Sequence, residues 1–122
     1  MSLEEVNGAG EAVQKNFVRK SNFSVHTNMK GGFVYIMTNK YNTTLYTGVT
    51  ANLEKRVYEH KSGTGSFFVT KYILIKLVWF DEFPSIEEAI TREKQIKKWK
   101  RQWKIEMIQK MNPSFKDLYD EI

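Results

Sequence analysis

The stretch FVYIMTNKYNTTLYTGVT, residues 33–50, decides the fold. It opens with a β-branched and aromatic run, 33–37, and closes with a second such run, 45–50, so each run predicts a strand. Asn39 and Asn42 lie between them, and asparagine favours turns because its side chain hydrogen-bonds to nearby backbone groups. The two strands should therefore pair as a hairpin with a rather long loop.

A helix and a third strand are expected after the hairpin. Asn52 predicts the N-cap of a helix that runs to about residue 61, with Glu54 in its first turn. Further along, residues 67–76 fit no single element, whereas the apolar run 77–81 predicts a strand. The sheet should therefore contain three strands.

Two more helices complete the pattern. Ser85 and Glu88 form a capping box that opens a long helix. The last helix spans about 101–111, and Asn112-Pro113 stops it. The order β-β-α-β-α-α predicts an α+β domain in which helices pack against a small sheet.

Length and composition limit the functions that remain open. At 122 residues the chain has room for one hydrophobic core. The absence of Cys excludes a disulfide scaffold, a thiolate zinc site and a cysteine nucleophile, and two His are too few for a multi-histidine metal centre. The net charge of +5 suits an anionic partner without requiring one. No apolar run approaches the roughly 18 residues of a membrane span, so we expect no membrane partner.

Residues 1–29 lack the hydrophobic periodicity of the rest, and we expect a loosely ordered N-terminal extension ahead of a domain that spans 30–122. This extension has no apolar stretch after a basic start, and it carries Glu4, Glu5 and Glu11. Neither a secretory signal nor a mitochondrial transit peptide matches that composition, so we expect a cytoplasmic protein.

One carboxylate interrupts an apolar helix stripe. In the helix that begins at Ile86, the stripe that contains Ile90 also passes through Glu93. A carboxylate that is half in the core needs a cation, a metal ion or a hydrogen-bond donor. Glu93 could pair with Lys97 one turn further on, or it could belong to a functional site.

The same region is strongly basic. Trp99 and Trp103 interleave with its cations, and basic residues with flat aromatics suit a phosphate backbone and unstacked bases. For the two tryptophans we favour packing in the core, because they are four residues apart on a helix. For the basic residues we favour nucleic-acid binding, which assigns this role to Arg92, Lys94, Lys97, Lys98, Lys100, Arg101 and Lys104.

A further group of residues surrounds the hairpin. Arg56 and His60 are four apart and share one face of the first helix, which follows the strands that carry Tyr35 and Tyr46. An arginine beside a phosphate neutralises the charge that develops there. Considered one by one, these four could equally be ordinary surface and strand residues. Gly48, inside a strand, indicates a bulge or a close backbone approach.

Taken together, these residues resemble the GIY-YIG nuclease family. Phe33-Val34-Tyr35 and Tyr46-Thr47-Gly48 stand where that family has its two tripeptides. Two positions depart from the family pattern, since Phe33 replaces a glycine and Thr47 an isoleucine. Neither side chain does chemistry in the family, so we expect changes in packing and retained activity.

The resemblance continues along the chain, from about Lys30 to Leu118. The segment 53–56 with His60 matches the family's arginine-bearing helix, and 89–94 matches its glutamate-bearing helix. Asn112-Pro113, with Asp117-Leu118, matches the ending of its small stand-alone bacterial members. The resemblance implies a three-stranded antiparallel sheet flanked by helices.

It also implies a divalent-metal-dependent endonuclease that hydrolyses DNA phosphodiester bonds. By that resemblance Glu93 would bind one Mg²⁺ or Mn²⁺ ion, and a sparse site of this kind suits Mg²⁺. Arg56 would stabilise the transition state, and either Tyr35 or Tyr46 would activate the water. His60 would position water or phosphate, and Asn112 would contact or brace the site.

Three functions stay open at this point. The first is a nuclease that cuts DNA, with structure-selective cleavage in repair or recombination as its expected setting. The second is a nucleic-acid-binding module on the same scaffold that does not cut. The third is a basic adaptor that docks acidic proteins. In the first case a protein partner could supply the sequence specificity that so short a chain lacks.

Overall fold

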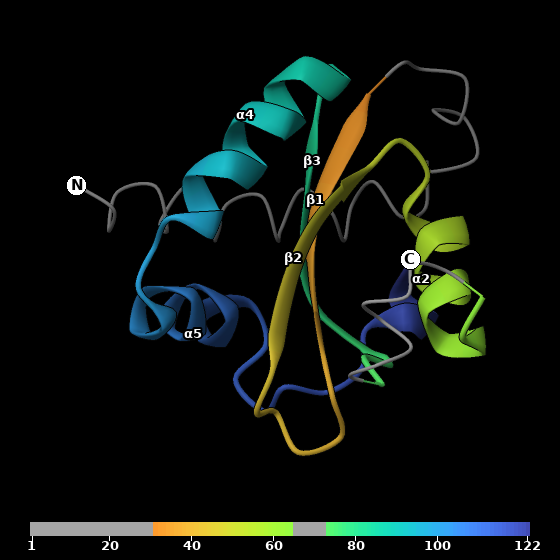
Figure 1. The fold of residues 1–122 in the computed structure, drawn as a ribbon, viewed down its shortest axis with the longest axis vertical. Helices are drawn as coiled ribbons and strands as arrows, with labels where there is room; N and C mark the ends of the chain where they lie inside the picture. Colours follow the sequence, from red (N-terminus) through yellow and green to blue (C-terminus); the bar gives the residue numbers. More distant parts are fainter. Residues whose placement is uncertain (1–30, 65–72) are drawn as a thin grey trace.

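A computed structural model describes residues 31–64 and 73–122 (Figure 1). The predicted extension, and residues 67–72 of the ambiguous stretch, lie outside these residues. The observed order confirms the β-β-α-β-α-α prediction, and a short 3₁₀ helix follows it. The elements are β1 (Gly32–Thr38), β2 (Leu45–Thr50), α2 (Leu53–Ser62), β3 (Lys76–Phe83), α4 (Ile86–Lys97), α5 (Arg101–Met111) and η2 (Tyr119–Glu121).

The three strands form one antiparallel sheet in the order β2-β1-β3. Tyr35, in the central strand β1, pairs with Gly48 of β2 on one side and with Phe80 of β3 on the other. The register between β1 and β3 shifts by one residue between Ile36 and Met37. Because β2 pairs only with β1 in this sheet, it is an edge strand.

Helices cover both faces of the sheet, which Figure 1 shows edge-on. Alternate residues of β1 point to opposite faces. Val34 and Ile36 join the core cluster that contains residues of α4 and α5. Tyr35 joins the other cluster, which contains Leu53 and Val57 of α2. The expected fold class, a three-stranded antiparallel sheet flanked by helices, is confirmed.

The predicted caps explain where two of these helices begin. The Asn52 side chain accepts a hydrogen bond from the backbone N–H of Lys55, at 3.1 Å. The Ser85 hydroxyl accepts one from the N–H of Glu88 and donates one to its carboxylate, both at 3.2 Å. Each cap satisfies a helix N–H that would otherwise lack a partner. No helix in the described part of the chain has both the length and the apolar character that a bilayer span requires.

Candidate active site

The site begins with an interlocked pair on the two strands of the hairpin. Gly48 lies so close to the ring of Tyr35 that a Cβ atom built on this glycine would be 2.6 Å from the phenol oxygen. Such a distance is far inside van der Waals contact, so a side chain at this position would have to displace the ring of Tyr35. The close approach that the sequence indicated at Gly48 is therefore real, and its partner is the first motif tyrosine.

α2 brings His60 onto this pair. The Tyr35 hydroxyl and His60 Nε2 are 3.0 Å apart, in a buried hydrogen bond between residues 25 positions apart in the chain. The His60 ring also packs beside Tyr46, with 5.5 Å between ring centroids, and the two tyrosine rings are 6.3 Å apart. His60 is only 3% exposed, so the interpretation of this residue as an ordinary surface histidine is wrong.

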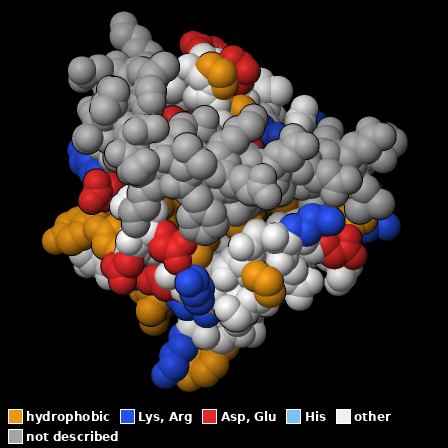
Figure 2. Space-filling view, turned by 180° about the vertical axis from the view of Figure 1, so that it is seen from behind, with side chains coloured by type: hydrophobic (Ala, Val, Ile, Leu, Met, Phe, Trp, Pro, Cys, Tyr) orange, Lys and Arg blue, Asp and Glu red, His pale blue; other side chains and the backbone are white. Residues whose placement is uncertain are grey.

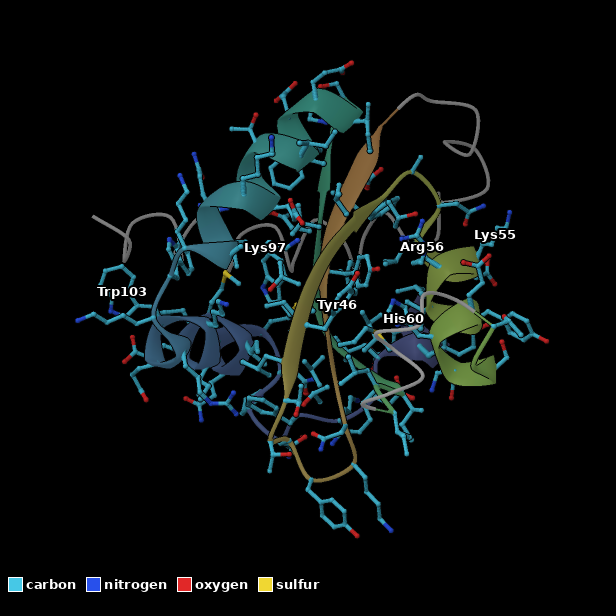
Figure 3. The ribbon with its side chains drawn as sticks, viewed as in Figure 1. Tyr46, Lys55, Arg56, His60, Lys97 and Trp103 are labelled. Carbon is cyan, nitrogen blue, oxygen red and sulfur yellow. The ribbon has the colours of Figure 1, made fainter. Side chains whose placement is uncertain are left out.

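Arg56 completes the group of four, one helical turn before His60. Burial works against its charge, but hydrogen bonding and charge interaction with Tyr35 leave the pKa of Arg56 above its usual value. The guanidinium also lies 3.4 Å from the carboxylate of Glu59. Arg56 thus stays protonated while its side chain remains partly open to solvent. Figure 3 shows Arg56 and His60 on α2, to one side of Tyr46.

Burial determines the charge state of His60. Its Nε2 shares a hydrogen bond with the Tyr35 hydroxyl, in which the donor depends on the tautomer of the ring. Its other ring nitrogen, Nδ1, is buried and has no hydrogen-bond partner. Burial, and then the nearby Arg56, lowers the pKa of His60 to about 4. The imidazole is therefore neutral near pH 7.

Tyr35 keeps its proton in this setting. Burial raises the pKa of Tyr35 well above its usual value, charge repulsion from Tyr46 raises it further, and Arg56 offsets only part of the rise. A phenol in these surroundings is a hydrogen-bond donor that holds its neighbours in place.

Glu93 lies apart from the four residues. It belongs to the buried stripe of α4 with Ala89 and Ile96, and α4 packs against the opposite face of the sheet from α2. Its carboxylate forms an ion pair with Lys97, with 2.6 Å between Oε2 and Nζ, as one of the two interpretations of the sequence expected. The sheet therefore lies between α4, which carries Glu93, and α2, which carries Arg56 and His60.

A metal ion at Glu93 would depend on few protein ligands. Among residues 31–64 and 73–122, no three His, Cys, Asp or Glu side chains come together as a metal cage. Glu93 is nevertheless a hard oxygen donor in a nearly buried position that already holds a cation, the ammonium of Lys97. Mg²⁺ needs few protein ligands because it retains several waters. The donor set therefore fits a single Mg²⁺ or Mn²⁺ ion whose other ligands come from water and substrate.

Asn112 braces the fold. Its amide nitrogen donates to the backbone carbonyls of Val78 and Lys116, at 3.2 and 2.7 Å, and its oxygen accepts from the Lys116 N–H at 3.1 Å. These bonds fasten the end of α5 to β3 and to the segment that follows. The structure thus gives a reason for a buried asparagine here, whereas its participation in catalysis stays a prediction.

Only some of the basic side chains of α4 and α5 are exposed to solvent. Arg92 lies over the ring of Trp99, 5.0 Å from its centroid, and Arg101 donates to the Asn42 carbonyl in the hairpin loop. Trp99 packs against the core, but Trp103 is 40% exposed, so the prediction that both tryptophans lie in the core is wrong for Trp103. The exposed cations of this region are Lys94, Lys97, Lys98, Lys100 and Arg101.

Seen from behind, the described residues show basic and acidic side chains side by side (Figure 2). The net charge of +5 therefore does not come from a continuous basic surface over the described part of that face.

The contact between Arg101 and Asn42 was not predicted. It joins groups 59 positions apart, and neither residue carries a local signal of the other.

Comparison with known proteins gives consistent results. A family model described as the GIY-YIG catalytic domain matches residues 31–106. A UPF0213 protein from Clostridium perfringens is 42% identical over 76 residues, which are 62% of this chain and 81% of that protein. A UPF0213 protein from Syntrophus aciditrophicus is 41% identical over 86 residues, which are 70% of this chain and 97% of that protein.

A solved structure is also similar. The solution NMR structure of a UPF0213 protein from Bacillus halodurans has 30% sequence identity to this chain and a TM-score of 0.44. The match covers 70% of this chain and 89% of that one.

Proposed function

The chain belongs to the GIY-YIG family, and from that premise we propose that it is a divalent-metal-dependent endonuclease that hydrolyses DNA phosphodiester bonds. One observation carries the proposal: Tyr35, Tyr46, Arg56 and His60, from two strands and a helix, pack into one cluster. A buried histidine bonded to a buried tyrosine beside a protonated arginine is a costly arrangement for a purely structural core. Such a cluster suits the binding and cleavage of a phosphate.

Arg56 provides the fixed positive charge. It remains protonated at any pH at which the protein is folded, and its side chain is partly exposed, so a substrate phosphate can reach it. The negative charge on a phosphodiester grows as water attacks it, and a cation already in place stabilises that charge without reorganisation. Tyr35, which is hydrogen-bonded to His60, interacts favourably with this guanidinium and helps to keep it in position.

The two tyrosines take different roles. Tyr35 retains its proton and is bonded to His60, so it orients the cluster. Tyr46 lies on the edge strand and is partly exposed, whereas Tyr35 is fully buried. We therefore assign the activation of the attacking water to Tyr46.

Glu93 would hold the divalent ion. When bound, that ion supplies polarisation of the scissile phosphate and stabilisation of the leaving oxygen. For Glu93 and Arg56 to act on one phosphodiester, the DNA backbone must lie along the outer edge of β2, between α4 and α2. We propose that its substrates are intermediates of repair or recombination, and that a protein partner supplies the specificity.

The test is cleavage of supercoiled plasmid and of a branched duplex, with and without Mg²⁺. We expect Mg²⁺-dependent cleavage by the native chain and loss of cleavage in Glu93→Ala and Arg56→Ala, with DNA binding retained. Glu87→Ala is the matched control, since Glu87 is an exposed carboxylate on the same helix. Tyr46→Phe should lower the rate about 100-fold or more, as the loss of a general base does, and Tyr35→Phe should lower it less.

Three results would contradict the proposal. DNA binding without cleavage by the native chain would favour the non-catalytic module. Cleavage that survives Glu93→Ala would show that Glu93 is not the ligand of the metal ion. A chain that binds acidic proteins, and whose DNA binding is weak and does not fall with salt, would favour the basic adaptor.

A further inference from the structure

Lys97 occupies the carboxylate that the proposed metal would need. The Glu93 side chain is 10% exposed, and the Lys97 side chain that pairs with it is 53% exposed. Separation of the ion pair therefore costs more free energy for Glu93 than for Lys97. The carboxylate needs a cation because it is nearly buried, whereas the ammonium can return to water at little cost.

Lys97 also lies within a group of like charges. Burial, followed by repulsion from Arg101 and Lys97, lowers the pKa of Lys104. Lys97 and Arg101 therefore both lie near Lys104, and Glu93 is the acid that pairs with Lys97. In Figure 3, Lys97 lies on the other side of β2 from Arg56 and His60. A phosphate that arrived along this edge would give Lys97 a second anionic partner.

We propose that Lys97 is a displaceable counter-ion, which neutralises Glu93 in the free protein and moves to a backbone phosphate when DNA binds. The inference rests on the proposed function, because it takes Glu93 as the metal ligand and DNA as the substrate. Glu93 then becomes available to a divalent ion in the complex. Metal and DNA each strengthen the binding of the other, because binding free energies are reciprocally linked.

The displacement has a simple electrostatic basis. A divalent ion at the Glu93 carboxylate would be repelled by the ammonium that already lies 2.6 Å from Oε2, so in the free protein metal binding must work against the ion pair. In the complex the phosphate holds Lys97 instead, and that cost disappears. Lys97 is thus a positioning residue, and its effect should appear in metal affinity before it appears in turnover.

The test measures Mn²⁺ affinity by calorimetry, without DNA and with a short duplex. The Arg56→Ala background keeps the duplex intact. Lys97→Met removes the charge at nearly unchanged length. Lys116→Met is the matched control, because Lys116 is an exposed lysine that pairs with another carboxylate, Glu121, at 2.9 Å. Glu93→Gln reports whether the bound ion is at Glu93. Circular dichroism verifies that each variant is folded.

We expect the Lys97→Met change to raise the Mn²⁺ affinity of the DNA-free protein about tenfold, which corresponds to about 1.4 kcal/mol. The duplex should strengthen Mn²⁺ binding about tenfold more when Lys97 is present than in Lys97→Met, where only direct phosphate ligation of the ion links the two binding events. Lys116→Met should behave like its parent in both conditions.

The outcomes separate the two proposals. If Glu93→Gln abolishes Mn²⁺ binding but Lys97→Met has the affinity and DNA dependence of its parent, the counter-ion role is overturned and the proposed function stands. If Mn²⁺ binding is absent in every condition or unaffected by Glu93→Gln, the metal assignment fails and the counter-ion role fails with it.

Discussion

At the scale of single residues, the contact between Tyr35 and Gly48 limits the size of the side chain that the hairpin tolerates at position 48. A methyl group at position 48 would lie 2.6 Å from the phenol ring, which is itself held by His60. We expect Gly48→Ala to lower the free energy of unfolding by about 1–3 kcal/mol, the usual cost of overpacking a core. Urea denaturation measures this loss.

A double-mutant cycle identifies the cause of that loss. In the Tyr35→Ala background the ring is absent, so Gly48→Ala should cost less than about 0.5 kcal/mol, as for sites that do not interact. An equal cost in both backgrounds would mean that the clash with Tyr35 is not the reason for the glycine.

His60 should make stability depend on pH. Its pKa is about 4 in the folded protein and near 6.5 when unfolded, so between these values the unfolded state binds more protons. Stability is therefore complete above pH 6.5 and falls as the pH decreases towards 4. Between pH 7.5 and 5 the loss attributable to His60 should be about 2 kcal/mol.

The His60→Gln variant isolates this contribution, because an amide can accept the Tyr35 hydrogen bond but does not titrate. The difference in unfolding free energy between the native chain and His60→Gln should shrink as the solution is acidified. A difference that stays constant from pH 7.5 to 5 would show that His60 is not the titrating group.

At the scale of elements, α2 depends on its first turn. Asn52 caps this helix through the Lys55 N–H, and the helix carries both Arg56 and His60. We expect Asn52→Ala to cost about 1 kcal/mol of stability and to speed hydrogen exchange in the first turn. Asn52→Asp retains a capping oxygen and should cost little. Equal losses in both variants would mean that the side-chain cap does not stabilise α2.

The elements could be predicted from the sequence because their signals are local. The Asn52 cap, the capping box at Ser85 and the stop at Asn112 each involve residues within a few positions of one another. The strand runs around Tyr35 and Tyr46 were equally plain, since strands favour β-branched and aromatic residues. The structure agrees with these elements to within one residue at the expected ends, except that β3 continues two residues beyond its predicted end, to Phe83.

The site was only partly predictable, because it depends on distances between elements. Spacing placed Arg56 and His60 on one helix face, but no local pattern showed that His60 would bond to Tyr35. Nor did any local pattern show that the Asn112 side-chain amide would donate hydrogen bonds to backbone carbonyls, one of them 34 positions away. The pattern did identify Glu93 as unusual, without indicating that α4 would cover the face opposite to α2.

At the scale of the whole molecule, the segment after α5 ties the layers together. Asp117 forms an ion pair with Lys61 of α2 and accepts hydrogen bonds from the N–H groups of Leu77 in β3 and of Tyr119. The Leu118 N–H in turn donates to the Leu77 carbonyl at 2.7 Å. One carboxylate therefore connects the helix that carries Arg56 to the sheet.

We expect Asp117→Ala to lower the unfolding free energy by about 1–3 kcal/mol, because it removes the partner of a partly buried N–H group as well as an ion pair. Asp117→Asn keeps an acceptor for Leu77 and should lose less. Thermal denaturation at neutral pH compares the two. If Asp117→Ala melted at the same temperature as the native chain, this segment would not contribute to the stability of the domain.

The fit of Tyr35 against Gly48 also has an evolutionary consequence. Positions 35 and 48 share one volume across two strands, so neither can drift independently. Among relatives, any side chain larger than hydrogen at position 48 should coincide with a smaller or absent ring at position 35. In a relative that has lost the aromatic ring at position 35, position 48 no longer needs to be glycine, and larger side chains can occur there.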